Sequence, residues 1–368
     1  MDQNNQFNSG RAVFFLLMTI TVILVAAVLK ITSSMMLQFM IAILLALVTS
    51  PLVKFLGKFH IPRIVSVLLI VVFLMGGIYA MGMVLYSSGR ALLPLYPKYE
   101  ARITEIYIWV ARIFELPYDE DLSIFANIWG QDNVRNSIRV MTLSFSNTFL
   151  GFLTDAFMMI IIMIFILIEA AIFKEKLNTA FEGTRVVQIN KIGLDIMTQV
   201  SGYLSIKFFI SLATGLLVGL GLWIVGVEFA AVWGIIQFIL NFIPVIGSIA
   251  VGVSATLFAL IQFWPNPMPV VAAGLVMLFF NITIGMILEP KITGDSLGIS
   301  PLMVLVSLMI WSYIWGFAGL VLAVPMLSII KIVCENIPVL EPISIILGSR
   351  KAVVAVKNAE EKEDKDEK

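Results

Sequence analysis

Long apolar runs dominate the chain, and each predicts an α-helix that crosses a lipid bilayer. The hydrocarbon core of a bilayer is about 30 Å thick, so a crossing helix needs about 20 mostly apolar residues. Because the first run lacks a convincing small-x-small cleavage site, we interpret it as a retained helix and not as a secretory signal. The sequence predicts an all-α, polytopic membrane protein whose full spans occupy residues 12–29, 35–53, 64–88, 148–172, 205–225 and 268–288.

Two further apolar stretches, residues 230–263 and 302–332, differ from the simple spans. Each is about 30 residues long and carries glycine or proline near its middle. Proline removes a backbone donor and cannot continue a helix undisturbed, and broken helices occur at membrane depth only where protein or a cavity surrounds them. Both stretches are therefore predicted to be broken or re-entrant helical hairpins.

The two broken stretches belong to segments with the same layout. Residues 205–263 and 268–332 each contain one full span, a polar or glycine-marked loop and a broken stretch. If both hairpins enter and leave by one side, the segments form an inverted repeat, and transporters built in this way hold their substrate near the midplane. The alignment that relates the segments pairs Gly226 with Gly298, Val232 with Val304, and Gly247 with Gly319.

The distribution of charge predicts the orientation of the chain in the membrane. Loops 54–63 and 174–207 are rich in lysine and arginine, and such loops stay in the cytoplasm. Segment 89–147 carries six basic and seven acidic residues and is expected to be an extracytoplasmic helical segment. We expect a multi-pass protein of the bacterial inner membrane, with both termini in the cytoplasm. The predicted organisation is spans 1–3 in 1–88, the outer segment 89–147, span 4 and a connection in 148–204, a transport core in 205–332, and a cytoplasmic tail in 333–368, whose end is disordered.

Composition narrows the possible functions. Hydrophobic residues make up 60% of the 368 residues and charged residues only 13%, which indicates a surface that faces lipid. Basic and acidic residues balance at 24 each, so nucleic acid is not an expected partner. One cysteine, Cys334, and one histidine, His60, exclude an intrachain disulfide and argue against histidine catalysis. The chain lacks Walker A and HExxH patterns, so we expect no enzyme activity, metal or cofactor.

Polar and helix-breaking residues in the hairpins are candidate contacts to a solute or ion. The ends of half-helices offer partial charges without a formal charge in the membrane. Small residues also permit close helix packing, and for any single position this alternative is equally good. The candidates are Gln237, Asn241, Pro244, Gly247 and Ser248 in the first hairpin, Glu289, Pro290 and Gly294 in the connection, and Ser312, Gly316 and Gly319 in the second hairpin.

Acidic residues within or beside the spans are few. Asp155 and Glu169 lie in the fourth predicted span, and Glu289 ends the sixth. A carboxylate at membrane depth is a functional candidate because exposure to hydrocarbon is costly. Asp155 and Glu169 are therefore candidate proton or cation sites, although pairing with a neighbouring span or placement at the interface would also explain them.

Three segments carry a resemblance to a known family. The run SGYLSIKFFISLATGLLVGLGLWIVGVEFAAVWGIIQFILNFIPVIGS (201–248) is similar to the signature stretch of the autoinducer-2 exporter family of membrane permeases. The run ILEPKITGDSLGISPLMVLVSLMIWSYIWGFAGLVLAVP (287–325) resembles the second signature, and PLVKFLGKFHIPR (51–63) resembles an early connection of the family. The matching positions are Asn241, Pro244, Gly247, Glu289, Pro290, Gly294, Gly298, Pro301, Gly316, Gly319 and Pro325.

The resemblance implies a bacterial permease that assembles as a homo-oligomer. Members of the family are associated with export of autoinducer-2, and others with exchange of Na⁺ or Li⁺ for protons. We therefore expect a secondary transporter that exports a small polar solute, such as autoinducer-2 or a related metabolite. The alternatives are a Na⁺(Li⁺)/H⁺ antiporter that carries a monovalent cation and an oligomeric channel.

Overall fold

The chain folds into helices, as the hydrophobic pattern predicts. The computed structural model describes residues 16–17, 19–21, 23–114, 131–180, 184–293, 297–337 and 339–349. Among these residues the only bridge between extended segments is an isolated one, Ile299 to Gly348. Seven of the described helices are long and apolar enough to cross a membrane. The prediction of an all-α, polytopic membrane protein is confirmed.

The helices include two π-helical segments, η1 and η2. Five of the predicted full spans fall within helices α2, α3, α5, α7 and the continuous stretch α10–η2, and part of the first span lies outside the described residues. The elements are α2 (Ser33–Gly57), α3 (Arg63–Ile113), α5 (Gln131–Ala180), α6 (Thr184–Asp195), η1 (Ile196–Val200), α7 (Ser201–Val225), α8 (Ala230–Leu240), α9 (Ile246–Phe263), α10 (Pro267–Phe280), η2 (Asn281–Leu288), α11 (Glu289–Thr293), α12 (Pro301–Glu335) and α13 (Glu341–Leu347).

The chain divides into two compact units, and each predicted hairpin belongs to a different one. The first-hairpin unit comprises Leu47–Ile160 and Ser201–Ser296, and contains helices α3 and α7 to α11. The second-hairpin unit comprises Met1–Ala46, Ile161–Val200 and Leu297–Lys368, and contains α6, α12 and α13.

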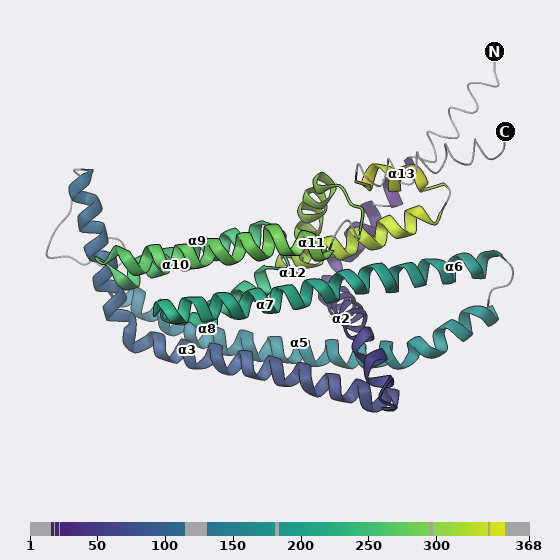
Figure 1. Cartoon of the computed structure of the whole chain (residues 1–368), viewed down its shortest axis with the longest axis horizontal. Helices are drawn as coiled ribbons and strands as arrows, with labels where there is room; N and C mark the ends of the chain where they lie inside the picture. The colour runs from purple at the N-terminus through teal and green to yellow at the C-terminus, as the bar shows by residue number, and fades with distance from the viewer. Residues whose placement is uncertain are drawn as a thin grey trace, which may run out of the picture. The chain divides into compact units, whose positions relative to one another are not determined.

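Four helices of the first-hairpin unit, α7 to α10, pack around a common apolar core (Figure 1). Small residues bring α7 and α8 into close contact. A Cβ on Gly215 would lie 2.6 Å from the carbonyl oxygen of Gly234, and a Cβ on Gly234 would lie 2.7 Å from that of Gly215. Glycine at both positions therefore permits the backbones to touch, as in other membrane helix pairs. The core residues are Val218, Leu222, Val227, Ala230, Val251, Ala255, Ala259, Ala273 and Met277.

The first broken stretch folds back on itself as a helical hairpin. Helix α8 ends at Leu240 and α9 begins at Ile246, so residues 241–245 form the tip. Beside the tip, a Cβ on Gly247 would lie 1.7 Å from the Leu240 carbonyl oxygen, which shows how closely the two arms approach. At the opposite end of the arms, the Gln262 side chain donates to the Gly226 carbonyl oxygen at 2.9 Å. The predicted break and helical hairpin are thus confirmed for this stretch, and its re-entry from one side of the membrane stays a prediction.

The tip of the first hairpin contains a strained turn. Val245 has φ 63° and ψ −56°, and the Ile246 N–H donates to the Pro244 carbonyl oxygen at 2.6 Å. These values describe a γ-turn with positive φ, a rare conformation that is costly for a β-branched residue. Strain of this kind costs roughly 1–3 kcal/mol and persists only where the surrounding structure enforces it.

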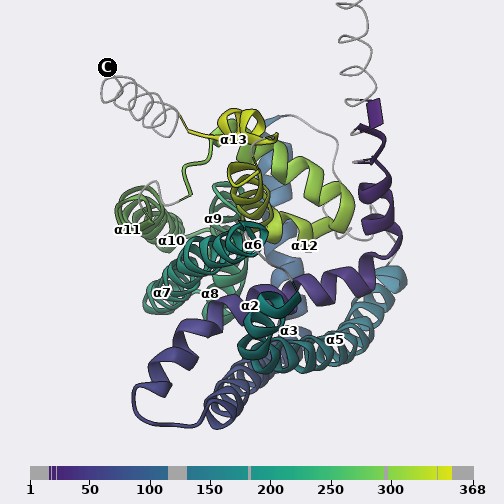
Figure 2. The ribbon, with the colours of Figure 1, turned by 90° about the vertical axis from the view of Figure 1, so that its right-hand side faces the viewer.

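Helix α12 contains the second hairpin. Gly316 has φ 61° and ψ −137°, which interrupts the helix near its middle. The Ser307 hydroxyl donates to the Ala323 carbonyl oxygen at 2.8 Å. In a straight helix these two residues would be about 24 Å apart, so the chain must reverse between them. Figure 2 shows the two arms of α12 and, beside them, α13.

The two hairpins share local geometry at the positions that the repeat aligns. Gly226 and Gly298 both have positive φ, 86° and 54°. A Cβ on Gly247 would lie 1.7 Å from the Leu240 carbonyl oxygen, and a Cβ on Gly319 would lie 1.8 Å from that of Trp311. This agreement supports the internal repeat. The inverted relation of its two copies stays a prediction.

Helix α3 extends well beyond the third predicted span. It runs without interruption to Ile113, so residues 89–113 of the predicted outer segment continue this helix. Pro94 and Pro97 lie inside the helix, and Figure 1 shows that α3 bends toward its C-terminal end. Proline removes a helical hydrogen bond and is a common cause of such a bend. Helix α5 likewise includes residues 131–147 of the same segment.

Candidate functional site

Five uncharged polar side chains form a hydrogen-bonded group near the tip of the first hairpin. Asn241 Nδ2 donates to Ser211 Oγ at 3.0 Å, and Ser248 Oγ donates to Asn241 Oδ1 at 3.1 Å. Asn281 Nδ2 donates to the Ser248 carbonyl oxygen at 3.3 Å, and Gln237 Nε2 donates to Asn281 Oδ1 at 3.1 Å. We call Ser211, Gln237, Asn241, Ser248 and Asn281 the polar cluster. They come from α7, α8, the hairpin tip, α9 and η2.

Irregular backbone surrounds the polar cluster. The hairpin tip, which begins with Asn241, separates Gln237 from Ser248, and π-helix η2 begins at Asn281. Within this segment, the Glu289 N–H donates to the Ile284 carbonyl oxygen, five residues back. Short π-helical segments inside α-helices occur frequently at functional sites. The sequence thus places two backbone irregularities at the same group of side chains.

Gln237 leaves one hydrogen-bond acceptor of the cluster open. Its side chain is 0% exposed, and its Oε1 is the one buried side-chain polar atom without a partner among the described residues. A buried polar atom without a partner costs about 1–3 kcal/mol. A hydroxyl, an amide N–H, a water molecule or a cation would each satisfy it. In the described part of the chain, no three histidine, cysteine or carboxylate side chains gather as a metal site.

A buried ion pair joins α7 to the start of α11. Lys207 Nζ donates to Glu289 Oε1, and the two side chains are 5% and 21% exposed. The charge pattern groups Lys207 with the basic connection 174–207, whereas the structure places it six residues inside α7, which begins at Ser201. Glu289, a predicted site residue, therefore has a specific partner that the charge pattern did not reveal.

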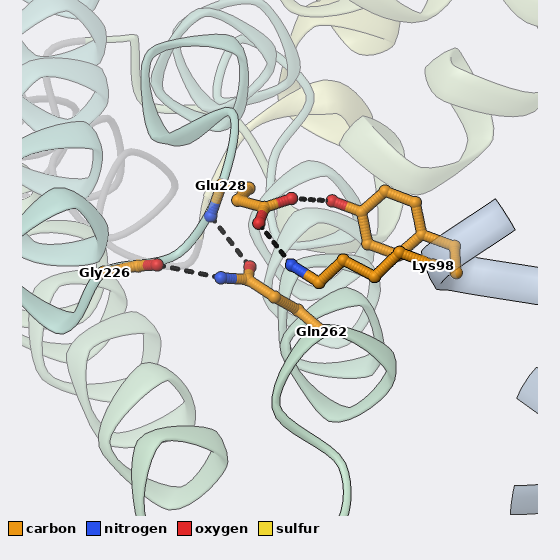
Figure 3. Close-up of polar contacts among 5 residues, drawn as sticks. Lys98, Gly226, Glu228 and Gln262 are labelled. Carbon is orange, nitrogen blue, oxygen red and sulfur yellow. Dashed lines mark hydrogen bonds and ion pairs between the residues drawn. The ribbon is translucent and has the colours of Figure 1, made fainter. Parts of the chain in front are cut away.

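A second polar group closes the base of the first hairpin (Figure 3). Glu228 lies in the connection between α7 and α8, and its carboxylate accepts hydrogen bonds from Lys98 Nζ, at 2.6 Å, and from the Tyr99 hydroxyl. Its backbone N–H donates to Gln262 Oε1 at 2.8 Å, and Gln262 Nε2 donates to the Gly226 carbonyl oxygen. We call this group the base clamp. It fastens both ends of the hairpin to each other and to α3.

The base clamp sets the charge state of Glu228. Partial burial opposes ionisation of the carboxyl, but the hydrogen bonds from Lys98 and Tyr99 outweigh it and hold the pKa of Glu228 below its ordinary value. For Tyr99, burial and then the neighbouring carboxylate raise the pKa of the hydroxyl. Glu228 is therefore an anion, and Tyr99 a neutral donor, over the physiological pH range.

Replacing Glu228 with glutamine should remove a pH-dependent part of the stability. The folded-state pKa lies below the ordinary value of 4.5, so the ionised carboxylate stabilises the fold above that pH, and this contribution is lost as the pH falls below it. We expect the melting temperature of the purified wild type to fall more steeply below pH 4.5 than that of Glu228→Gln. Parallel melting curves for the two proteins between pH 3 and 7 would contradict this assignment.

The remaining predicted residues of the first-hairpin unit differ in their surroundings. Pro244 and Gly247 lie at the tip and beside it, whereas Pro290 is exposed in α11. Gly294 lies outside the described residues. Asp155 is exposed on α5 and does not belong to the polar cluster.

Four predicted residues lie in the second-hairpin unit. Gly316 forms the interruption of α12, and Gly319 is the close-contact position beside it. Ser312 donates to the Met309 carbonyl oxygen of its own helix at 2.9 Å. Glu169 forms an exposed ion pair with Lys176. These residues mark the hairpin tip and a surface contact, and each stays a candidate.

Several residues of the polar cluster, the ion pair and the base clamp were not among the predicted site residues. Asn281 is a polar residue in the middle of an apolar span, and Lys207 is a charge inside the predicted span 205–225. Both signals are visible in the sequence. Gln262 and Lys98 give no such signal, because only the fold brings them to the same connection.

Comparison with known proteins identifies relatives over nearly the whole chain. A sequence profile of the AI-2E family transporters matches residues 14–338. A candidate transport protein of Borreliella burgdorferi is 30% identical over 87% of this chain and 86% of its own. The AI-2 transport protein TqsA of Escherichia coli K12 is 27% identical over 87% of this chain and 91% of its own. The candidate transport protein YhhT of the same bacterium is 27% identical over 90% and 93%.

These relatives agree with the fold. Their names describe transport, and seven helices in the described part of this chain are long and apolar enough to cross a membrane. The protein is therefore a multi-pass membrane transporter. With the profile matched across most of its length, the chain belongs to the AI-2E transporter family.

Proposed function

We propose that the protein is a secondary transporter that exports a small polar solute, with autoinducer-2 or a related metabolite as the solute. The name of the E. coli relative TqsA supports the choice of solute. The chain carries no Walker A pattern that would supply ATP as the energy source. The family consists of transport proteins, which favours a carrier without enzyme activity.

The open acceptor on Gln237 carries this proposal. It is fully buried, and it lies among side chains that are polar but uncharged. A solute hydroxyl that donated to Gln237 Oε1 would complete the hydrogen bonding of the polar cluster. A solute bound there would be held beside the tip of a broken helix, where transporters of this architecture place their substrates.

We further propose that the protein lies in the bacterial inner membrane as a homo-oligomer, with both termini in the cytoplasm. The basic residues of loop 54–63 support this orientation. Many large apolar side chains are exposed on the single chain, which lipid or a second subunit would cover.

A flux assay tests the proposed function. Purified protein is reconstituted into liposomes loaded with autoinducer-2, and efflux is measured against protein-free liposomes. Gln237→Met removes the open acceptor while keeping a side chain of similar volume. We expect autoinducer-2 efflux to fall about tenfold, the equivalent of one hydrogen bond of about 1.4 kcal/mol.

Thr256→Val is the matched control for this assay. Its hydroxyl donates only to the Gly252 carbonyl oxygen of its own helix at 2.7 Å, and it is not part of the polar cluster. We expect its efflux to match that of the wild type. Equal efflux from Gln237→Met and wild type would remove the proposed site. Flux of Na⁺ or Li⁺ in place of autoinducer-2 would favour the antiporter, and unitary currents in a planar bilayer would favour the channel.

A further inference from the structure

One face of α7 carries a buried polar stripe that the proposed solute site does not fully use. Tyr203, Lys207 and Ser211 follow one another at intervals of four residues, so they share one face of the helix. They are 9%, 4% and 0% exposed. Polar side chains on a buried helix face of a membrane protein lower its stability, because apolar side chains at the same positions would stabilise the fold more.

The stripe joins the ion pair to the polar cluster. Ser211 Oγ accepts a hydrogen bond from Asn241, and Lys207, one turn before it, is bonded to Glu289. Along a helix, positions four residues apart are separated by about 6 Å. Glu289 closes η2, the π-helix whose first residue is Asn281 of the polar cluster. Two separate backbone segments, α7 and η2, therefore connect the ion pair to the polar cluster.

The ion pair lies about one hydrocarbon thickness from the far end of α7. Lys207 precedes Val225, the last residue of α7, by 18 positions, which corresponds to about 27 Å of helix. This length is close to the thickness of the hydrocarbon core. Glu289 retains 21% of its side-chain exposure, whereas Lys207 retains 5%. Of the two charged side chains, Glu289 is therefore the more exposed.

Among the residues that the structure describes, few other titratable groups surround the pair. Tyr203 of α7 is the buried neighbour of Glu289. Lys291 of α11 and Lys54 of α2 are exposed. Helices α8 and α10, which pack against α7, carry no titratable side chain in their described sequences. Charge at this position is therefore governed by Lys207 and Glu289 themselves.

We propose that the Lys207–Glu289 pair is the site at which proton movement is coupled to solute movement, an inference that rests on the proposed function. Glu289 takes a proton from a hydronium ion on one side of the membrane, so that one O–H bond breaks in the hydronium ion as one forms on the carboxyl, and the reverse exchange returns the proton to water on the other side. No other bond changes. While Glu289 is ionised, the pair is neutral overall.

The coupling follows from the cost of an unpaired charge. Protonation of Glu289 leaves the ammonium of Lys207 without its counter-charge, one turn from the polar cluster. An unpaired charge in a low-dielectric environment is costly, so protonation shifts the population toward conformations that solvate Lys207 or offer it a new partner. Since Ser211 links this helix face to Asn241, such a shift alters the surroundings of the bound solute.

The experiment measures protons carried per solute molecule. Proteoliposomes containing autoinducer-2 and a trapped pH indicator are given a solute gradient, and both fluxes are recorded. We expect wild type to move protons with the solute, and Glu289→Gln to lower the ratio of protons to solute at least tenfold. An unchanged ratio in Glu289→Gln would overturn the proposal.

A second measurement decides the case in which Glu289→Gln carries no solute. Infrared difference spectra of the purified protein at two pH values report the protonation of individual carboxyl groups. We expect a carboxylic-acid band in wild type that is absent from both Glu289→Gln and the doubly neutral variant Lys207→Gln/Glu289→Gln. The double variant leaves no unpaired charge and therefore separates loss of the proton site from loss of the fold. Identical difference spectra for wild type and variants would refute the inference.

Exchange of the two charges distinguishes coupling from simple stabilisation. Lys207→Glu/Glu289→Lys keeps an ion pair but moves the carboxylate from the partly exposed to the buried position. If the ion pair only stabilised the fold, this variant would recover the wild-type ratio of protons to solute. That result would also overturn the proposal. Absence of any solute flux in wild type would instead remove the proposed function, whereas solute flux without proton movement would remove only the coupling.

Discussion

Gly247→Ala should abolish folding of the first hairpin. A Cβ at this position would lie 1.7 Å from the carbonyl oxygen and 2.6 Å from the carbonyl carbon of Leu240, and both are backbone atoms. Contacts below 3.0 Å are not found for real Cβ atoms, so the two arms would have to separate. Separation would also pull Ser248 away from Asn241 and open the polar cluster. We expect loss of transport and a destabilisation above about 4 kcal/mol, at the extreme of single substitutions.

Gly252→Ala is the matched control in the same helix. The nearest atom to its Cβ would lie at 3.6 Å, an ordinary contact. Because alanine favours helix over glycine by about 1 kcal/mol, this variant should be as stable as wild type or slightly more stable. Melting curves in detergent and the efflux assay would compare the two variants. A folded, active Gly247→Ala protein would show that the hairpin does not close in the way described.

Lys207→Met should destabilise the protein strongly. The substitution removes one partner of a buried ion pair and leaves the Glu289 carboxylate without its counter-charge. Breaking a buried pair in this way typically costs about 3–5 kcal/mol, more than the pair itself contributes. The effect should appear as a fall in melting temperature of the purified protein at neutral pH.

The double variant Lys207→Met/Glu289→Met tests the physical cause. With both charges gone, no carboxylate remains unpaired, and apolar replacements of buried pairs are often neutral or stabilising. We expect the double variant to recover most of the stability that the single variant loses. If both variants melt at the same reduced temperature, packing of the lysine stem and not charge would account for the loss.

The hairpins could be predicted because their signal is local. An apolar stretch of about 30 residues with Pro244 and Gly247, or with Gly316 and Gly319, near its middle is too long for one span and too irregular for one straight helix. The geometry also explains why glycine is needed. Gly247 and Gly319 each face a carbonyl oxygen of the opposite arm, and Gly316 has positive φ.

The partners of polar residues could not be predicted in the same way. Gln237, Asn241 and Ser248 share one hairpin and were found together, but Asn281 reaches them only because η2 packs against α7. Lys207 was grouped with a basic connection, since charge counting along the chain does not reveal that α7 starts four residues before the predicted span. The environment of Lys207 is set by its tertiary contact with Glu289, which the local sequence pattern does not reveal.

The bend of α3 at its two prolines has a practical consequence. Residues up to Leu92 meet the criteria for a membrane-crossing helix, whereas Lys98, Tyr99 and the rest of the helix lie beyond them. The arm from residue 93 to Ile113 is about 31 Å long. Through Glu228, which accepts hydrogen bonds from Lys98 and Tyr99, this arm holds the base of the first hairpin. We therefore expect an antibody fragment that binds this arm to restrict movement of the first hairpin through the base clamp.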